Sequence, residues 1–349
     1  MSIVIWVVLD VEGPQTRNDN AQEGMVALAK MYGLGQEIGE RAYQRFSVID
    51  GIWGDFRQIP QDPAYSSGHT LKVVLPFYKA MGADSKWLYD FARQSLRVVP
   101  GIYEVLTRLV WDYNVWMIST SYEWFIRAYC HFVRFPFASA NCTSASGFDD
   151  VPLDPNDAAM LRDFMREVAA MPVIEYDEKT GVVIPDHQTH YDRITSFIWD
   201  RVYNMPVGAF LRDVHPVGQT QKREALEAVC QRFGVPKEKV MYVGDSQTDV
   251  QVVEWLRGMG LTMMFNGKGR VCGLSDIMCV GDNALAIEEV VRRFAKLGRD
   301  GTIRYYLSRR AAECGGLLAS VTPDNIEELH ELSVKKRKEL RGAAVGELT

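Results

Sequence analysis

The chain has 349 residues, of which 47% are hydrophobic and 24% charged, a composition typical of a soluble globular protein. Its net charge of -6 argues against a nucleic-acid backbone as the main partner, although a bound cation could still create a site for an anionic substrate. Six cysteines without a CxxC pair, at 130, 142, 230, 272, 279 and 314, indicate reduced thiols of a cytoplasmic protein rather than a disulfide framework or a zinc site.

The first predicted element is a strand. The apolar run MSIVIWVVLD is interrupted by Asp10 and is too short to cross a bilayer. We therefore expect residues 3–9 to form a buried strand rather than a signal peptide. No other run approaches the roughly 18 apolar residues of a spanning helix, so no membrane span is expected. Two carboxylates, Asp10 and Glu12, follow the strand in VVLDVEGPQ.

The next segments are predominantly helical. Residues 20–98 are predicted to be helices, with a Gly- and Pro-rich interruption before TLKVVLPFYKAMG. Around this interruption, His69 and Lys72 are expected to face an anionic substrate. A helix over 102–112 and a strand over 115–119 follow, and a cluster of hydroxyl residues begins where the strand ends.

The remaining segments alternate between strands and helices. Residues 122–217 are predicted to form a second long insertion, with a hairpin at VIEYDEKTGVVIPD and helices on either side. A helix that carries Lys222 near its start follows, and then the strands VMYVG, LTMMFNG and DIMCVG alternate with helices. This alternation predicts a parallel sheet with helices on both faces.

Polar residues stand at the ends of the predicted strands. In such sheets the chemistry lies beyond the carboxyl ends of the strands, where Asp10, Ser119 and Asp245 fall. Asp10 and Asp245, with the backbone carbonyl near Glu12, suit a hard divalent ion such as Mg²⁺. Asp249, four residues after Asp245, is expected to hold the metal or a metal-bound water.

The same groups suit phosphoryl transfer. Asp10 is the candidate nucleophile, because an aspartate can take up a phosphoryl group and be regenerated by water, and Glu12 is the candidate general acid and base. Lys222 would neutralise charge on the transferred group, with Arg223 and Lys237 as alternatives.

Hydroxyl groups are expected to bind the phosphate oxygens. Ser119 and Thr120 are the candidates, together with Lys222 and nearby backbone N–H groups. The strand pattern makes Ser119 the last strand residue, and a slip by one residue would bring Thr120 or Ser121 into its role.

These motifs, in this order, resemble the haloacid dehalogenase (HAD) superfamily, whose members are mostly Mg²⁺-dependent phosphatases. The first motif of the family is usually Asp-x-Asp-Gly-Thr, and here Glu12 and Pro14 replace its second Asp and its Thr. An Asp-x-Glu-Gly start is similar to that of a phosphoserine:homoserine phosphotransferase branch, so the change does not imply loss of activity. The segments DVEGPQTRNDNA, SGHTLKVVLPF, ISTSYEWF, VGDSQTD, FNG and KKRKELRGAAVGEL resemble a mainly archaeal HAD group that includes proteins labelled energy-converting hydrogenase A subunit R.

The predicted fold is therefore α/β, with a Rossmann-like parallel sheet core (the HAD fold) and two cap insertions. The expected divisions are a core of 1–13, 99–121 and 218–300, a helical cap of 14–98, a second cap of 122–217 and a C-terminal helical segment of 301–349. The basic run KKRKELR at 335–341 predicts a solvent-exposed helix face, with docking of a protein partner as the alternative.

The predicted function is that of a cytoplasmic, Mg²⁺-dependent phosphatase that hydrolyses a small phosphorylated metabolite through an aspartyl-phosphate. The alternatives are a non-catalytic accessory subunit of a larger, hydrogenase-like complex, a phosphotransferase, or another HAD chemistry. Dehalogenation needs no metal and would leave Asp245 idle, and C–P cleavage would leave Glu12 without a role.

Overall fold

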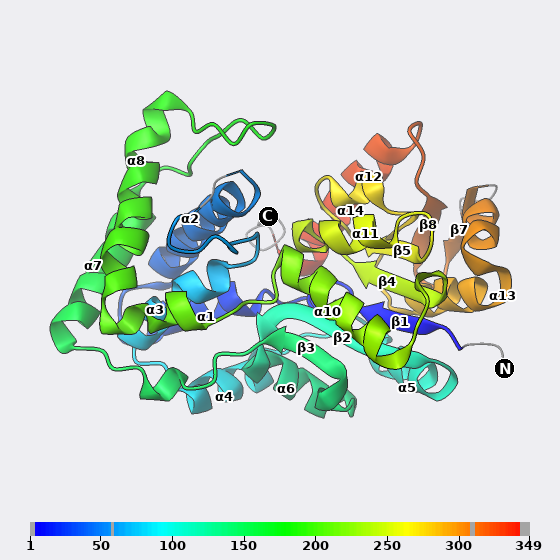
Figure 1. The fold of residues 1–349 in the computed structure, drawn as a ribbon, viewed down its shortest axis with the longest axis horizontal. Coiled ribbons are helices and arrows are strands. Elements are labelled where there is room, and N and C mark those ends of the chain that lie inside the picture. The colour runs from blue at the N-terminus through cyan, green and yellow to red at the C-terminus, as the bar shows by residue number, and fades with distance from the viewer. Residues whose placement is uncertain (1–3, 57–58, 308–310, 343–349) are drawn as a thin grey trace.

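The computed structural model describes residues 4–56, 59–307 and 311–342. Within these ranges the chain forms one sheet of eight strands, in the order β3-β2-β1-β4-β5-β6-β8-β7 (Figure 1). The strands are β1 (Trp6–Leu9), β2 (Asn114–Tyr122), β3 (Ala140–Thr143), β4 (Val240–Gly244), β5 (Leu261–Phe265), β6 (Ile277–Gly281), β7 (Ala311–Glu313) and β8 (Gly316–Ser320). The helices are α1 (Asn20–Tyr32), α2 (Gln36–Asp55), α3 (Thr70–Ala80), α4 (Ser85–Ser95), α5 (Ile102–Asp112), α6 (Glu123–Val133), α7 (Pro155–Ala170), α8 (Pro185–Ser196), α9 (Ala209–Asp213), α10 (Gln219–Phe233), α11 (Val250–Leu256), α12 (Val271–Leu274), α13 (Leu285–Leu307) and α14 (Ile326–Arg341).

The sheet confirms the predicted α/β class. Strands β1 to β6 are parallel, and β1 lies between β2 and β4, where Val8 is opposite Trp116 and Tyr242. Strand β8 pairs antiparallel with β6, and β7 pairs antiparallel with β8. Because β1 has a parallel neighbour on each side, the residues that follow it meet those that follow β2 and β4 at one edge of the sheet.

The apolar run of β1 is explained by burial on both faces of the sheet. Val7 and Leu9 pack on the face covered by α5, α6 and α13, and Val8 packs on the opposite face with α10 and α11. Successive side chains of a strand point to opposite faces, so a strand covered by helices on both sides needs apolar residues at every position.

Local signals set the ends of several helices. Helix α1 begins where the side chain of Asp19 accepts a 3.0 Å hydrogen bond from the Gln22 N–H, and it ends at Gly33 with φ 88°. Helix α5 has the predicted bounds, 102–112. None of the helices in the described ranges is both long enough and apolar enough to cross a membrane.

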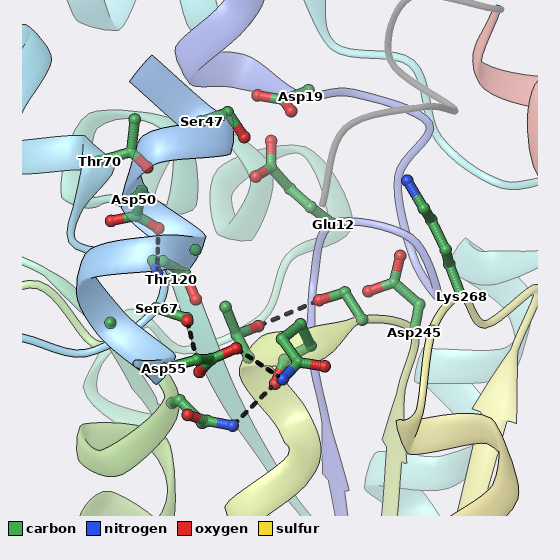
Figure 2. A pocket seen from close by; sticks show the side chains of 18 of the residues that line it. Glu12, Asp19, Ser47, Asp50, Asp55, Ser67, Thr70, Thr120, Asp245 and Lys268 are labelled. Carbon is green, nitrogen blue, oxygen red and sulfur yellow. Dashed lines mark hydrogen bonds between the residues drawn. The ribbon is translucent and has the colours of Figure 1, made fainter. Parts of the chain in front are cut away.

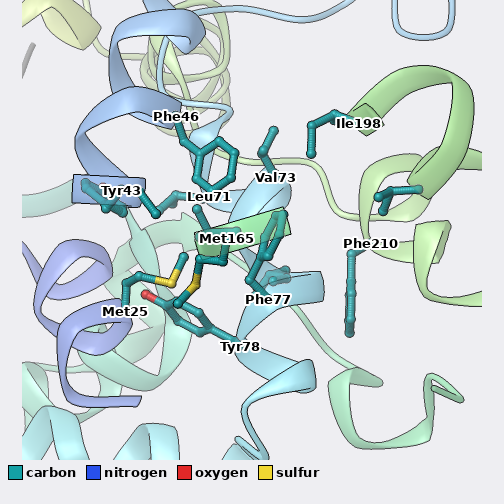
Figure 3. Close-up of a cluster of buried hydrophobic side chains, with 14 of the residues drawn as sticks. Met25, Tyr43, Phe46, Leu71, Val73, Phe77, Tyr78, Met165, Ile198 and Phe210 are labelled. Carbon is teal, nitrogen blue, oxygen red and sulfur yellow. The ribbon is translucent and has the colours of Figure 1, made fainter. Parts of the chain in front are cut away.

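The two predicted insertions are packed against one another. Met25, Tyr43 and Phe77 from the first insertion share one buried cluster with Met165 and Phe210 from the second (Figure 3). Helices α2 and α3 both contact α7 in this cluster. The two insertions therefore cover the core with one shared cap, which lies at the left of Figure 1.

The sheet takes in more of the chain than the predicted boundaries allow. Strand β3 pairs with β2, although it belongs to the segment 122–217 predicted as a cap. Strands β7 and β8 belong to the segment 301–349, which was predicted to be helical. In the described part of this segment, only α14 and the end of α13 are helical. These additions satisfy the backbone groups of β2 and β6, which would otherwise be sheet edges.

Candidate active site

Asp10 directly follows the central strand β1. Its backbone N–H donates to the Val243 carbonyl (2.9 Å), which continues the pairing of β1 with β4, and Gln15 Nε2 donates to its carbonyl (2.8 Å). The Val11 N–H donates to Asp10 Oδ1 (2.6 Å), and the residue is 4% exposed. Strand pairing and these hydrogen bonds fix the carboxylate at the carboxyl edge of the sheet.

Lys222, in the first turn of α10, reaches the Asp10 carboxylate. Its Nζ lies 2.5 Å from Asp10 Oδ2 and 2.8 Å from Asp249 Oδ1, and the side chain is fully buried. Burial alone would lower the pKa of Lys222, but the charges of the two aspartates outweigh it and raise the pKa above its usual value. The alternatives lie elsewhere: Arg223 pairs with Glu224 and Glu227, and Lys237 lies over the Trp255 ring.

Both oxygens of Asp249 are engaged by protein donors. Oδ1 accepts from Lys222 Nζ and from the Tyr242 hydroxyl (2.7 Å), and Oδ2 accepts from the backbone N–H groups of Asp245 (2.8 Å) and Ser246 (2.9 Å). Burial would raise the pKa of Asp249, but the charge of Lys222 outweighs it and the pKa falls below its usual value. These contacts suit a group that orients Lys222 and the turn at Asp245.

Asp245 follows β4 and faces Asp10 across the site. Gly13 lies against it with φ 101°, and a Cβ at this position would be 2.2 Å from Asp245 Cγ. A residue without a side chain is therefore required in the turn after Glu12. Asp245 Oδ2 accepts hydrogen bonds from two guanidinium groups, those of Arg337 and Arg341 (3.2 Å).

Neither of these two arginines was predicted from the sequence to be a site residue. They lie on α14 in the run KKRKELR, which was predicted to be a solvated helix face. That prediction holds for Lys335 and Lys338, which are exposed, and is wrong for Arg337 and Arg341, which are 5% and 9% exposed. The available signal was their spacing, because residues four apart lie on the same side of a helix.

The hydroxyl cluster belongs to the end of β2, which continues to Tyr122, beyond the predicted end at 119. Ser119, Thr120 and Ser121 all line the same cavity. The Ser121 N–H donates to Ser119 Oγ (3.3 Å), whereas no hydrogen-bond partner of Thr120 Oγ1 is present among the described residues. Ser119 and Thr120 thus both lie where an anion beside Asp10 could be bound.

Glu12 directly precedes the first turn and points towards Asp19 and Ser47 (Figure 2). Its Oε1 accepts a 2.6 Å hydrogen bond from the backbone N–H of Asn20, at the start of α1. Burial, and then the charge of Asp19, raise the pKa of Glu12 to about 8. Burial likewise raises the pKa of Asp10, to about 7, against the opposing charge of Lys222. Glu12 is therefore protonated at neutral pH.

One cavity of about 790 Å³ lies between the core and the cap, and it is lined by Asp10, Glu12, Asp245, Ser119, Thr120, Ser121, Arg337 and Arg341. Lys222 and Asp249 do not line it, and Lys222 contacts the lining residue Asp10. Figure 2 shows Asp50, Asp55 and Thr70 of the cap opposite Asp245 and Lys268 of the core. The cap and the core are joined at its wall, where Asp55 accepts hydrogen bonds from Ser67 (2.8 Å) and from Gln247 (3.0 Å).

His69 and Lys72 do not line this cavity, contrary to the expectation that they face an anionic substrate. Lys72 is buried in an ion pair with Asp62, and His69 Nε2 lies 3.1 Å from Gln221 Oε1. Their neighbour Thr70 lines the cavity instead. Through Gln221, His69 connects the cap to α10, the helix that carries Lys222.

The residues at the edge of the sheet fit a divalent cation. Carboxylate oxygens of Asp10, Asp245 and Asp249 lie within 4.8 Å of one another, and oxygen ligands are those that Mg²⁺ prefers. Among the described residues, Asp249 accepts four hydrogen bonds from protein donors, whereas the carboxylates of Asp10 and Asp245 accept two each, so Asp10 and Asp245 are the better direct ligands. The guanidinium of Arg337 on Asp245 shows that this carboxylate is placed to meet positive charge.

Part of the chain matches a known family. Residues 213–288, which include Lys222, Asp245 and Asp249, match the family model of haloacid dehalogenase-like hydrolases. No curated protein matches the chain in sequence.

A solved structure shares the fold over nearly the whole chain. The gene product AF1437 from Archaeoglobus fulgidus is 21% identical, with a TM-score of 0.81 over 99% of both chains. Two structures of phosphoserine phosphatase are more distant. The substrate-bound form is 12% identical with a TM-score of 0.47, over 83% of this chain and 99% of that chain. The apo form is 11% identical with a TM-score of 0.43, over 82% and 98%. Residues 213–288 are therefore similar to haloacid dehalogenase-like hydrolases, and the likeness to the Archaeoglobus fulgidus protein concerns the fold.

Proposed function

We propose that this protein is a Mg²⁺-dependent phosphatase that hydrolyses a small phosphorylated metabolite through an aspartyl-phosphate on Asp10. The observation that carries the proposal is the placement of the Asp10 carboxylate. It lies at the end of the central strand, bonded to Lys222 and grouped with Asp245, beside a cavity that the cap covers.

The reaction has two steps. A carboxylate oxygen of Asp10 attacks phosphorus, the bond from phosphorus to the alcohol oxygen breaks, and Glu12 gives its proton to the departing alcohol. Glu12 suits this role because its pKa of about 8 keeps it protonated at neutral pH. Water then attacks the phosphorus and gives its proton to Glu12, which releases inorganic phosphate and regenerates Asp10.

Positive charge and hydrogen-bond donors stabilise the transferred group. Lys222 offsets negative charge on the phosphoryl oxygens, and Ser119 and Thr120 bind those oxygens through their hydroxyls. A Mg²⁺ ion held by Asp10, Asp245 and the backbone carbonyl of Glu12 would supply further positive charge. Asp249 acts indirectly, by holding Lys222.

The size of the cavity favours a small substrate. A volume of about 790 Å³ lies within the range of roughly 300–1,000 Å³ typical of sites for small molecules. The cap supplies a wall that separates the reaction from bulk water, and it leaves little room for a folded phosphoprotein.

The finer assignment rests on the sequence alone. We place the chain in the mainly archaeal HAD group that includes proteins labelled energy-converting hydrogenase A subunit R, because of the motifs quoted above. We propose a cytoplasmic location because the six cysteines form no CxxC motif and are typical of reduced thiols.

The test is phosphate release from sugar phosphates, phospho-amino acids, nucleotides and cofactor phosphates, with Mg²⁺ and with a chelator. We expect release from at least one class, only with Mg²⁺, and none from Asp10→Asn. A complete lack of turnover on the whole panel, with a co-purifying protein partner, would favour the accessory-subunit alternative.

A further inference from the structure

Helix α14 is fixed on the core by one of its faces. Ser333 Oγ donates to the Gly267 carbonyl (2.7 Å), and the Gly269 N–H donates to His330 Nε2 (3.1 Å). His330 and Ser333 share this face with Arg337 and Arg341, because residues three and four apart lie on one side of a helix. The docking of the first two turns therefore directs both arginines into the cavity, which they line.

The guanidinium groups of Arg337 and Arg341 are buried with unused donors. Both donate to Asp245 Oδ2, and Arg341 also donates to the Asn18 carbonyl. The Nε of each arginine has no hydrogen-bond partner within the described ranges. Buried donors are almost always satisfied in folded proteins, so these two indicate a ligand that the described residues do not provide.

The charges in direct contact at this end of the cavity do not balance. Two buried guanidinium groups share hydrogen bonds with one carboxylate, that of Asp245, and the more distant charge of Asp19 also acts on Arg341. A cation bound to Asp245 would compete for the charge of this carboxylate as well. In the proposed reaction, Lys222 and the cation offset the negative charge of the phosphoryl group, on the Asp10 side of the site. Because an unpaired buried charge is costly, an anion in direct contact with Arg337 and Arg341 would stabilise both guanidinium groups.

The position of Arg341 indicates which part of the substrate carries this anion. Asn18, whose carbonyl it contacts, lies in the segment between Glu12 and α1. Arg341 is also close enough to Glu12 for its charge to oppose the rise in pKa that burial causes there. Glu12 is the proposed proton donor to the leaving alcohol, so the arginines lie on the side of that alcohol.

We propose that Arg337 and Arg341 form a subsite for a second acidic group of the substrate, a carboxylate or a second phosphate on the alcohol that leaves. The inference rests on the proposed phosphatase function and narrows its substrate class to phosphate esters of acidic alcohols. The planar guanidinium groups, with their fork of N–H donors, match the oxygens of either acid. Lys268 and Arg270 line the core side of the same cavity, whereas the acidic residues Asp50 and Asp55 line its cap side.

The test is equilibrium binding to full-length Asp10→Asn protein with Mg²⁺, measured by titration calorimetry. One pair of probes is 3-phosphoglycerate and glycerol 3-phosphate, which differ by a carboxylate. The other pair is fructose 1,6-bisphosphate and fructose 6-phosphate, which differ by a phosphate. We expect the acidic member of at least one pair to bind about tenfold more tightly, the size of one charge-assisted hydrogen bond. The pair that shows the preference identifies whether the second acidic group is a carboxylate or a phosphate.

The preference must depend on the arginines. Adding Arg337→Gln or Arg341→Gln should reduce it to below about threefold, and Arg341→Lys should restore part of it. Lys335→Gln removes one charge from the exposed side of the same helix and should leave the preference unchanged. Circular dichroism shows whether each variant folds.

Four outcomes would contradict the proposed subsite. With the arginines intact, these are equal binding within both pairs, or no binding of either acidic probe. In the glutamine variants, they are a preference that survives both substitutions, or an equal loss of affinity for both members of each pair. The last would mean that the arginines serve the phosphoryl group or only hold α14. Binding needs no turnover, so it decides the subsite even if the wild-type protein releases no phosphate.

Discussion

The ammonium of Lys222 donates a 2.5 Å hydrogen bond to Asp10 Oδ2, although 212 residues separate the two in the chain. The contact joins the start of α10 to the end of β1, and it is fully enclosed, since Lys222 is 0% exposed. A lysine buried against a carboxylate keeps its charge because that charge is paired. It can then offset the charge that accumulates on a phosphoryl group bound to Asp10.

Lys222→Ala should lower kcat by about 100-fold or more, because one preorganised electrostatic contact contributes on the order of 3 kcal/mol to the barrier. Arg223→Ala is the matched control, since Arg223 pairs with Glu224 and Glu227 on its own helix. It should change kcat by less than about twofold. Phosphate release by folded protein measures both. A loss under threefold in Lys222→Ala would move the charge-stabilising role to another residue.

Trapping of the acyl-phosphate distinguishes the proposed roles of Asp10 and Glu12. Asp10→Asn should form no covalent phospho-enzyme, because the amide is a poor nucleophile. Glu12→Gln should still be phosphorylated by esters with good leaving groups, and the phospho-enzyme should accumulate because water then lacks a base. Near-wild-type turnover of Glu12→Gln would reduce Glu12 to a structural acid at the turn.

The pH dependence of kcat/KM follows from the same two groups. Activity should rise as Asp10 loses its proton, at a pH below 7 when a cation favours its charged form, and should fall above about 8 as Glu12 loses its proton. Glu12→Gln should lose the descending limb for esters with good leaving groups. Asp19→Asn removes a negative charge that raises the pKa of Glu12, so its descending limb should move to lower pH. An unmoved limb in both variants would exclude Glu12 as its source.

Cation affinity should respond in opposite directions to changes on the two sides of Asp245. Asp245→Asn removes a proposed ligand and should weaken Mg²⁺ binding about tenfold or more. It should also lower the free energy of unfolding, because it removes the negative charge that pairs with the buried guanidinium groups of Arg337 and Arg341. Arg337→Gln removes a group that competes for Oδ2 and should strengthen binding. Titration calorimetry with Mg²⁺ alone checks both. A weaker Mg²⁺ affinity in Arg337→Gln would show that the arginine supports the cation site.

Gly13→Ala tests the close approach of the first turn to Asp245. Its Cβ would lie 2.2 Å from Asp245 Cγ, in a backbone with φ 101°. Gly33→Ala is the control, because Gly33 has a similar φ of 88° and open space around it. Both should lower the free energy of unfolding by about 1–3 kcal/mol through backbone strain. Only Gly13→Ala should also weaken Mg²⁺ binding and turnover, and equal turnover of the two variants would contradict this.

The sequence determined the sheet and the meeting of its strand-end residues. The apolar run before Asp10 and the alternation of strands with helices after Lys222 are local patterns, and they require burial on both faces of a parallel sheet. Since the carboxyl ends of parallel strands meet at one edge, Asp10 and Asp245 follow adjacent strands β1 and β4 in the structure. That outcome needs no knowledge of side-chain packing.

The tertiary structure decided which charged residues enter the site. In sequence, Arg337 and Arg341 differ little from Lys335 and Lys338, and His69 and Lys72 resemble candidate anion ligands. The direction of a charged side chain depends on how its helix docks. For α14 this was set by contacts such as that between Ser333 and Gly267, 66 residues apart. Such long-range contacts leave no periodic signal in the chain, because each is one pairing between two distant positions, whereas burial of a strand or a helix face repeats from residue to residue.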